Sequence, residues 1–456
     1  MSKEEIKEEQ MNNTPQAEEV QAIKTSEFMK ETIKQRPINK KKLVRKLFIT
    51  VTTAVVFGLV ACLTFLFLEP IISERLNPEE EVEQVTFLEE TIEEETKPED
   101  MIADESELMP APKEAPVMDD TRLEEILSGI TLDVDDYLAL NNVVTDMASE
   151  VSGSIVKVIG ITQDVDWFDN EYSSENIVSG VVVADNGRDF LILANIKPLK
   201  DLDKLEVKFA KGDAKASEIL AKDSVTGLAI IAVKKSILSI SLIDSVKIIE
   251  MGSSVYKNLS GTPVVALGRP QGTDQSIGIG YVTSSTGVLN LPDAAYRGLS
   301  TDIIGKDGAS GILVNMNGQL IGIIDQTYNP SDMKNLISGI GISDIKKLIE
   351  KLSNGKEIPY LGLYGVDVTP EIGTKMNIPI GVYIKSMEMD SPLFESGVQN
   401  GDIIVKFAGA DIVTFMEINN LLLSLSPEEK QKITVMRQGP DGYTPLELEV
   451  VLAHQK

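Results

Sequence analysis

The stretch of sequence that decides the fold is TDIIGKDGASGILVNMNGQLIGI, residues 301–323. Two short apolar runs, GILVN and QLIGI, flank Asn317-Gly318, a dipeptide typical of tight turns between antiparallel strands. A glycine-rich turn, GKDGASG, precedes the first run and carries Ser310. The pattern predicts a β-hairpin that follows a turn with a serine hydroxyl.

Similar short apolar runs continue outward from this stretch, from residue 154 to residue 325. Turn signals such as Asp185-Asn186-Gly187 separate them, which is typical of an antiparallel sandwich or barrel. Residues 137–151 have the apolar spacing of a short amphipathic helix that precedes the strands. Residues 341–355 have the pattern of a closing helix that ends at Gly355.

The order of five strings resembles the HtrA/Deg family of trypsin-like serine proteases. The resemblance implies two six-stranded β-barrels over residues 131–355, an all-β fold. It is carried by the following strings: SGVVVADNGRDFLILANIKPL (179–199), DSVTGLAIIAVK (223–234), GTPVVALGRPQGTDQSIGIGYVTS (261–284), TDIIGKDGASGILVNMNGQLIGI (301–323) and GIGISDIKKLIEKL (339–352).

The family's chemistry requires a serine nucleophile, a histidine base and an aspartate that orients the histidine. The resemblance places Ser310 at the serine position, Lys197 at the histidine position and Gly227 at the aspartate position. It also implies an oxyanion hole at Gly308 and Ser310, although the loop is one residue shorter after the serine. An unassisted serine hydroxyl is a poor nucleophile, so we expect a pseudoprotease.

Two residues are candidates to replace the missing histidine as the base. His454 is the only histidine, two residues from the C-terminus, and we expect it to be exposed and outside the barrels. Lys197 is the other candidate, because serine–lysine dyads exist on other folds. Its ammonium group would need burial to act as a base, and its neighbours Lys200, Asp201 and Asp203 indicate an exposed stretch.

Residues 357–454 resemble a PDZ domain, an α+β fold, of the protease-linked type. The specific string is SPLFESGVQNGDII (391–404), which departs from the family pattern at Leu393 and Ser396. PDZ domains capture a peptide C-terminus as an added strand whose carboxylate is held by backbone amides. The resemblance places the peptide-binding residues on a loop and on a helix: Tyr360, Leu361, Gly362, Leu363, Asn420, Leu421 and Ser424. It also implies that the loop leads into an edge strand from Leu363 to Val368. The alternative is that Leu361 and Leu363 only fill the core.

Residues 47–68 form an uncharged apolar run of 22 residues, which is long enough to cross a bilayer as one helix. Basic residues precede the run and acidic residues follow it, so we expect a cytoplasmic N-terminus and extracytoplasmic folded domains. A cleaved signal peptide is the rival interpretation, and the length and position of the run disfavour it. Residues 1–40 are polar and predict a disordered cytoplasmic tail.

The segment 69–130, here called the acidic linker, holds 19 acidic and three basic residues within positions 69–120. Its charge and its prolines predict a disordered, extended spacer, with binding of cations or of a basic cell-wall polymer as the alternative. The whole chain of 456 residues has a net charge of −28, which argues against nucleic-acid binding. One cysteine and one histidine exclude a disulfide framework and a cysteine- or histidine-rich metal site, and no cofactor is expected.

Together these features predict a membrane-anchored pseudoprotease that binds C-terminal or unfolded peptide segments, for envelope quality control or scaffolding. An active endopeptidase using Ser310 with Lys197, and a structural envelope component, remain as alternatives. The resemblance also implies a homotrimer, with residues 137–151 as a candidate contact, or association with an active relative. The cell membrane of a Gram-positive bacterium would suit this architecture, as an inference from family habit.

Overall fold

The computed structural model describes residues 45, 48–60, 64, 82–87, 133–165, 171–199, 202–255 and 259–455. The chain divides into two units, 1–79 and 80–456. In the first unit residues 48–60 are helical, and the hydroxyls of Thr52 and Thr53 donate to the carbonyls four residues earlier. No helix within the described ranges is both long and apolar enough for a membrane span. The predicted tail 1–40 and positions 47, 61–63 and 65–68 of the predicted span lie outside those ranges.

The second unit begins with an extended segment, 82–87, that the prediction of a wholly disordered linker over 69–130 did not include. The amide of Val85 donates to Asn354 Oδ1 at 3.0 Å, and the Asn354 side-chain amide donates back to the Val85 carbonyl at 2.8 Å. Val85 is buried in the same core cluster as the helix that closes the barrels. Paired backbone groups and a buried valine therefore order this part of the acidic linker, and the rest lies outside the described residues.

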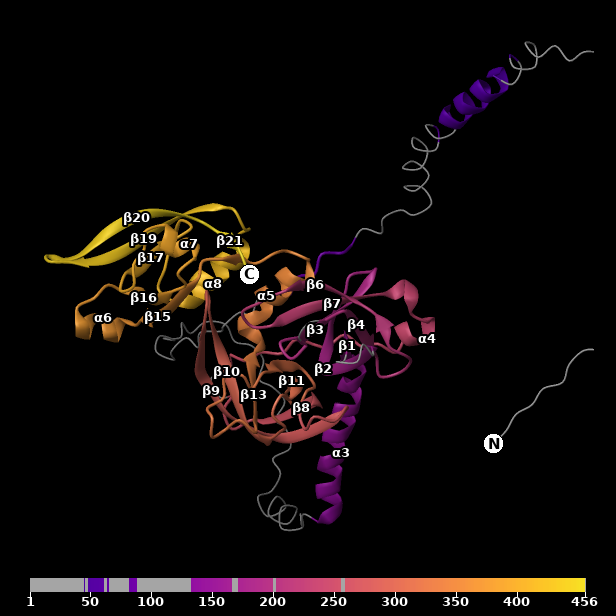
Figure 1. The fold of residues 1–456 in the computed structure, drawn as a ribbon. Coiled ribbons are helices and arrows are strands. Elements are labelled where there is room, and N and C mark those ends of the chain that lie inside the picture. The colour runs from indigo at the N-terminus through magenta and orange to yellow at the C-terminus, as the bar shows by residue number, and fades with distance from the viewer. Residues whose placement is uncertain are drawn as a thin grey trace, which may run out of the picture. The chain divides into compact units, whose positions relative to one another are not determined.

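Helix α3 (Val134–Val151) precedes the strands and is longer than the predicted 137–151. Asp133 and Asp136 form a reciprocal capping box that satisfies the first amides of the helix. Ala148 and Val151 at its C-terminal end are buried in the core, whereas the N-terminal turns extend beyond the barrel (Figure 1).

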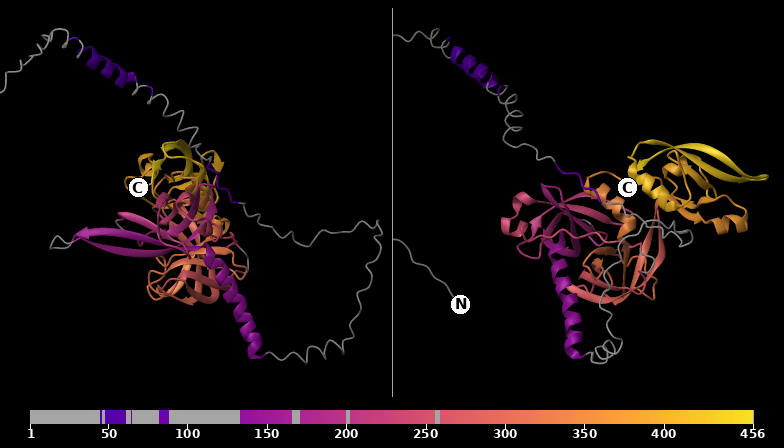
Figure 2. Two further views of the ribbon diagram at one scale, coloured as in Figure 1. Left: turned by 90° about the vertical axis from the view of Figure 1, so that its right-hand side faces the viewer. Right: turned by 180° about the vertical axis from the view of Figure 1, so that it is seen from behind.

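Seven hydrogen-bonded strands form the first sheet, in the order β5-β4-β1-β2-β3-β7-β6. Its outermost strands, β5 and β6, are separated in sequence only by Ser217, whose amide donates to Leu205 of β4. The first sheet thus differs from the expected six-stranded barrel: it has seven strands, and its two edges are joined through Ser217; it is called the first barrel below. β1 and β2 extend as a long hairpin away from the rest of this sheet (Figure 2). The strands are β1 (Ile155–Val165), β2 (Glu171–Asp185), β3 (Asp189–Asn195), β4 (Lys204–Lys208), β5 (Lys215–Ala216), β6 (Glu218–Lys222) and β7 (Leu228–Lys234).

The second sheet is a closed six-stranded barrel in the order β10-β13-β12-β11-β8-β9, as the resemblance implied. The hairpin predicted from residues 301–323 is present as β11 and β12. Short helix α4 (Ile240–Ile243) lies between the two sheets in sequence, and α5 (Ile342–Ser353) follows the second barrel. The strands are β8 (Pro263–Arg269), β9 (Ser276–Leu291), β10 (Ala294–Ile304), β11 (Ser310–Val314), β12 (Leu320–Ile324) and β13 (Leu336–Gly341).

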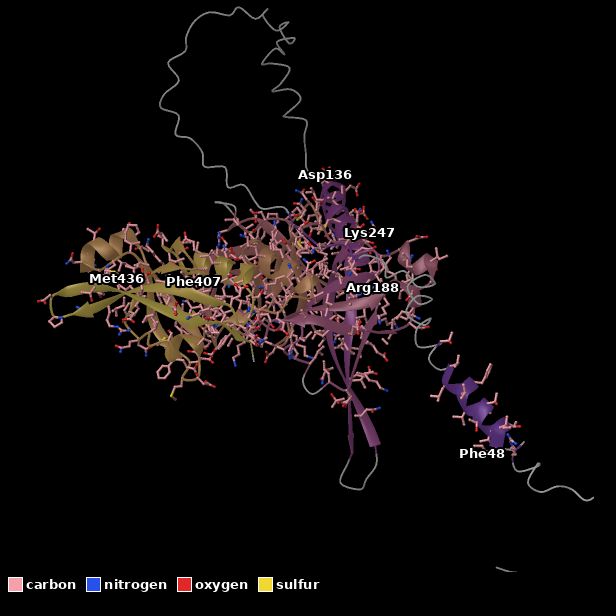
Figure 3. All side chains as sticks on the ribbon, turned by 90° about the horizontal axis from the view of Figure 1, so that it is seen from above. Phe48, Asp136, Arg188, Lys247, Phe407 and Met436 are labelled. Atoms are coloured by element: carbon pink, nitrogen blue, oxygen red, sulfur yellow. The ribbon has the colours of Figure 1, made fainter. Side chains whose placement is uncertain are left out.

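The C-terminal part, residues 359–454, holds a six-stranded twisted sheet in the order β15-β16-β17-β19-β20, with β18 paired to β17, a two-stranded sheet of β14 and β21, and short helices (Figure 1). Phe407 and Phe415 are fully buried at its centre, and Phe407 is labelled in Figure 3. The predicted edge strand 363–368 is β15. The elements are β14 (Pro359–Tyr360), β15 (Leu363–Val368), α6 (Pro370–Met376), β16 (Gly381–Met387), α7 (Pro392–Glu395), β17 (Ile403–Phe407), β18 (Ala410–Asp411), α8 (Phe415–Ser424), β19 (Lys430–Gly439), β20 (Gly442–Val451) and β21 (Ala453–His454).

Candidate functional site

Ser310 lies where the two barrels meet. It is the first residue of β11, pairs with Arg269 of β8, and is 5% exposed. Its Oγ accepts a hydrogen bond of 3.0 Å from the amide of Ser179 in β2 of the first barrel. The Ser310 hydroxyl is therefore held by the backbone of the opposite barrel, a contact that orients the oxygen without removing its proton.

Gly311, directly after Ser310, is a position that only glycine fits. Its φ is +135°, and a Cβ there would stand 2.1 Å from the Leu267 carbonyl oxygen. Gly308, on the other side of Ser310, has φ +76°. The tight approach of β11 to β8 thus depends on Gly311, whereas Gly308 serves only the left-handed backbone of the turn.

Lys197 follows β3 and lines the same small pocket as Ser310. Its Nζ donates to the Tyr328 hydroxyl at 3.0 Å and lies 5.1 Å from the centre of that ring. Among the described residues no hydrogen bond joins Lys197 to Ser310. The ammonium group is therefore directed to a phenol and its ring rather than to Ser310 Oγ.

Gly227 lies in the loop between β6 and β7, with φ +75°. A Cβ at this position would be 2.2 Å from Lys197 Cγ and 3.0 Å from Asn195 Oδ1. The aliphatic stem of Lys197 therefore occupies the space that a side chain at the aspartate position would need. The lysine at the histidine position and the glycine at the aspartate position therefore fit together, because the lysine stem fills the space that the glycine leaves open.

The pocket beside Ser310 has a volume of about 130 Å³ and contains polar groups that the sequence reasoning did not single out. Asn195 donates to Asp325 Oδ2 at 3.1 Å, and Asp325 is 5% exposed. Gln326 Oε1 accepts from the Ala309 amide at 3.0 Å, in the loop between Gly308 and Ser310 that the resemblance assigns to the oxyanion hole. Asn195 stands two residues before Lys197, inside one of the strings that carry the family resemblance. Its place in that string could have identified it as a residue of the site.

His454 is on β21, which pairs with β14 in the C-terminal domain. Its ring contacts Glu357 and Glu428, and the hydrogen bonds to these carboxylates raise the pKa of His454. It is exposed, as the sequence reasoning expected, and it is absent from the residues that line the Ser310 pocket.

The loop predicted to hold the carboxylate of a peptide is bonded, in the structure, to a side-chain carboxylate of the chain itself. The amides of Leu361, Gly362 and Leu363 donate to the carboxylate of Asp293 at 2.8, 3.0 and 2.8 Å. Gly362 has φ +78°, which helps to turn successive amides toward one oxygen pair. Tyr360 is buried and its hydroxyl donates to Glu388; both factors raise its pKa well above the usual range.

The three helix residues predicted to line the peptide pocket do not share one environment. Asn420 and Ser424 line a cavity of about 850 Å³ that α5 residues also line, and Leu421 packs against the core of the C-terminal domain. The α8 side chain that reaches Asp293 is Asn419, whose Nδ2 donates to the Asp293 carbonyl at 3.2 Å. The role of its neighbour Asn420 in lining the peptide pocket stays a prediction.

Comparisons with known proteins agree with this architecture. Residues 178–323 match the trypsin-like peptidase domain and residues 359–450 match the PDZ domain. The "Serine protease Do-like HtrB" of Bacillus subtilis is 27% identical over 282 residues, 57% of this chain and 59% of the relative. The chain belongs to the HtrA/Deg family. A second family member, the "Periplasmic pH-dependent serine endoprotease DegQ" of Escherichia coli, is 26% identical over 290 residues, 61% of this chain and 59% of the relative.

Both alignments thus span under two thirds of the relatives' own length. Among solved structures, "HtrA-type protease AlgW with decapeptide" is similar, with a TM-score of 0.51 and 18% identity, over 68% of this chain and 98% of that one. That likeness supports the fold. The curated HtrA/Deg relatives are named as serine proteases, whereas this chain has Lys197 and Gly227 at two of the three triad positions.

Proposed function

We propose that this HtrA/Deg-family chain is a pseudoprotease that captures peptide C-termini through its PDZ domain. The observation that carries the proposal is the loop 361–363, whose three amides converge on a carboxylate. Backbone amides at the start of an open-edged strand are the groups by which PDZ domains hold a terminal carboxylate. The similar AlgW structure is described as holding a decapeptide, which supports peptides as the ligand class.

The barrel contributes no hydrolysis in this proposal. Ser310 lacks a hydrogen-bonded base, and the acid position holds glycine. Loss of triad members leaves only residual acceleration from binding and oxyanion stabilisation. The competing candidate is an endopeptidase that uses Ser310 with Lys197, which is favoured by their common pocket and by the names of the relatives.

Casein hydrolysis by the full chain separates these candidates, with Ser310→Ala as the matched control. We expect equal background rates from both proteins, because the wild-type serine has no base. Cleavage by the wild type alone, lost again in Lys197→Ala, would establish the endopeptidase. Capture is tested with a fluorescent decapeptide that ends in valine and with its C-terminally amidated form. Only the free acid should bind, and equal binding of both peptides would contradict carboxylate capture.

The cellular setting is part of the same proposal. Residues 47–68 would anchor the chain in the cell membrane, with residues 1–40 in the cytoplasm and the folded domains outside, where they would serve envelope quality control or scaffolding. The asymmetry of charge around the apolar run supports this orientation. Carbonate extraction of membranes and protease protection of intact cells test the anchor and its direction.

Helix α3 is the proposed contact for a homotrimer or for an active relative. Its N-terminal turns expose apolar side chains, including Tyr137 at 70%, Leu140 at 70% and Val143 at 61%. Exposed apolar clusters of this kind are typical of protein-binding surfaces. We expect a mass above that of one chain in analytical ultracentrifugation, and a return to the monomer mass in Leu140→Glu.

A further inference from the structure

Asp293 occupies a backbone position where glycine would be the less strained choice. The two residues Pro292 and Asp293 join β9 to β10, and Asp293 has φ +61°. A proline followed by a residue with positive φ is typical of a type II turn, in which glycine or asparagine usually takes the second place. Aspartate at this position indicates that the carboxylate itself has a use.

The polar atoms of Asp293 contact the PDZ domain. Its carboxylate accepts the three amides of the 361–363 loop, and its own amide donates to the Leu363 carbonyl at 2.8 Å. Its carbonyl accepts from Asn419 on α8 at 3.2 Å, and the residue is only 4% exposed. Asp293 therefore lies between β15 and α8, with a carboxylate in the loop and an amide bonded to the first residue of the edge strand.

We propose that Asp293 is an internal ligand of the PDZ domain, which keeps the carboxylate-binding loop closed until the β9–β10 turn leaves it. The proposal rests on the proposed peptide capture, because Asp293 would occupy the place of a peptide's terminal carboxylate. A trans-acting peptide must then compete with a group that is always present at high local concentration. The degenerate barrel thereby controls access to the binding domain.

Opposing contributions set the stability of the docked state, in which Asp293 occupies the loop, so the turn can both bind the loop and leave it. Charge-assisted hydrogen bonds from three amides favour it. Burial opposes it and raises the pKa of Asp293 to about 6, with the nearby Glu388 adding to the rise. Asn419 Oδ1 is also buried without a hydrogen-bond partner among the described residues. Such an unsatisfied acceptor weakens the docked state, because its desolvation is not repaid by a hydrogen bond.

Further polar contacts join the PDZ domain to the barrels. The ammonium group of Lys351 on α5 donates to the carbonyls of Leu423 and Leu425 at the end of α8. Gln455 donates to Asp223 at 2.7 Å in the β6–β7 loop. Because these contacts do not involve the loop, removal of the Asp293 carboxylate should expose the loop without separating the domains.

Amide hydrogen exchange of the full chain, read by mass spectrometry, tests closure directly. We expect protection of the peptide covering residues 361–363 in the wild type and at least about tenfold faster exchange in Asp293→Ala. Asp293→Asn, which keeps one acceptor oxygen, should be intermediate. Asp332→Asn is the matched control, because it removes the same charge from an exposed residue of the same barrel. Fast exchange already in the wild type would refute the closed loop.

Peptide affinity in the same variants tests gating. The valine-terminated decapeptide should bind about tenfold or more tightly to Asp293→Ala than to the wild type, because apparent affinity scales with the open fraction. Faster loop exchange without tighter binding of a peptide that does bind would overturn gating. Binding to no variant, with the loop exposed in Asp293→Ala, would refute the proposed peptide capture while exchange still supports closure.

Discussion

Substitutions at Gly227 and Lys197 should have coupled effects on the free energy of unfolding. The perturbation is Gly227→Ala, measured alone and in a Lys197→Ala background. In the wild type the new Cβ would stand 2.2 Å from Lys197 Cγ and 2.9 Å from its Cδ, both of which Lys197→Ala removes. The contact at 3.0 Å to Asn195 Oδ1 remains in both backgrounds and belongs to the end of a short polar side chain.

Two separable effects set the magnitude. A non-glycine residue at φ +75° is disfavoured by roughly 1–2 kcal/mol whatever surrounds it. Overpacking against the lysine stem adds roughly 1–3 kcal/mol. We therefore expect Gly227→Ala to lower the free energy of unfolding by about 2–5 kcal/mol in the wild type. In Lys197→Ala the same change should lower it by only about 1–2 kcal/mol.

Urea denaturation of the wild type, the two single variants and the double variant measures the coupling. Gly187→Ala is the matched control, because Gly187 also has positive φ, at +90°, but has nothing within 4 Å of an added Cβ. It should show the backbone effect alone, about 1–2 kcal/mol, and no coupling to Lys197→Ala. If the Gly227 and Lys197 variants are additive within about 0.5 kcal/mol, the lysine stem does not fill the aspartate position.

Three further results are expected. Burial raises the pKa of Asp293 to about 6, so the docked carboxylate takes up a proton more readily than the released one. Docking should then strengthen by roughly 1.3 kcal/mol from pH 7 to pH 5, and decapeptide binding, followed by fluorescence polarisation, should weaken about tenfold; constant affinity would contradict this. Gly311→Ala should lower Tm steeply or prevent folding, since its Cβ would overlap the Leu267 carbonyl; a normal Tm would refute that packing. Asn354→Ala should make residues 82–87 exchange faster, and unchanged exchange would show that the side chain does not hold the segment.

The sequence predicted the parts of this fold that depend on local patterns. The apolar runs around Asn317-Gly318 became β11 and β12, and the edge strand 363–368 became β15 with the same bounds. It did not predict the break in the first sheet at Ser217, nor the order of residues 82–87. The segment 82–87 (VEQVTF) lies within an acidic stretch and is ordered by residues far away in the chain, which include Asn354, Glu350 and Asn186.

The candidate sites show the same division. The carboxylate-binding loop could be placed from its own string, because its amides converge through the local backbone around Gly362. The occupant of the loop could not, because Asp293 comes from a turn about 70 residues earlier and reaches the loop only when the barrel and the PDZ domain dock. Tyr328 escaped notice for the same reason, since it meets Lys197 across 131 positions of sequence.

The contacts also explain why a barrel without a triad remains useful to the PDZ domain. The β6–β7 loop that carries Gly227 is closed by a hydrogen bond from the Gly227 amide to the Asp223 carbonyl at 2.8 Å. The side chain of Asp223 accepts from Gln455, directly after the last PDZ strand, and the barrel also supplies Asp293 to the carboxylate loop. Both contacts depend on the backbone conformation of the β6–β7 loop and the β9–β10 turn, and neither depends on a catalytic base. The proposed control of peptide capture therefore needs the β9–β10 turn and the β6–β7 loop but no histidine at position 197 and no aspartate at position 227.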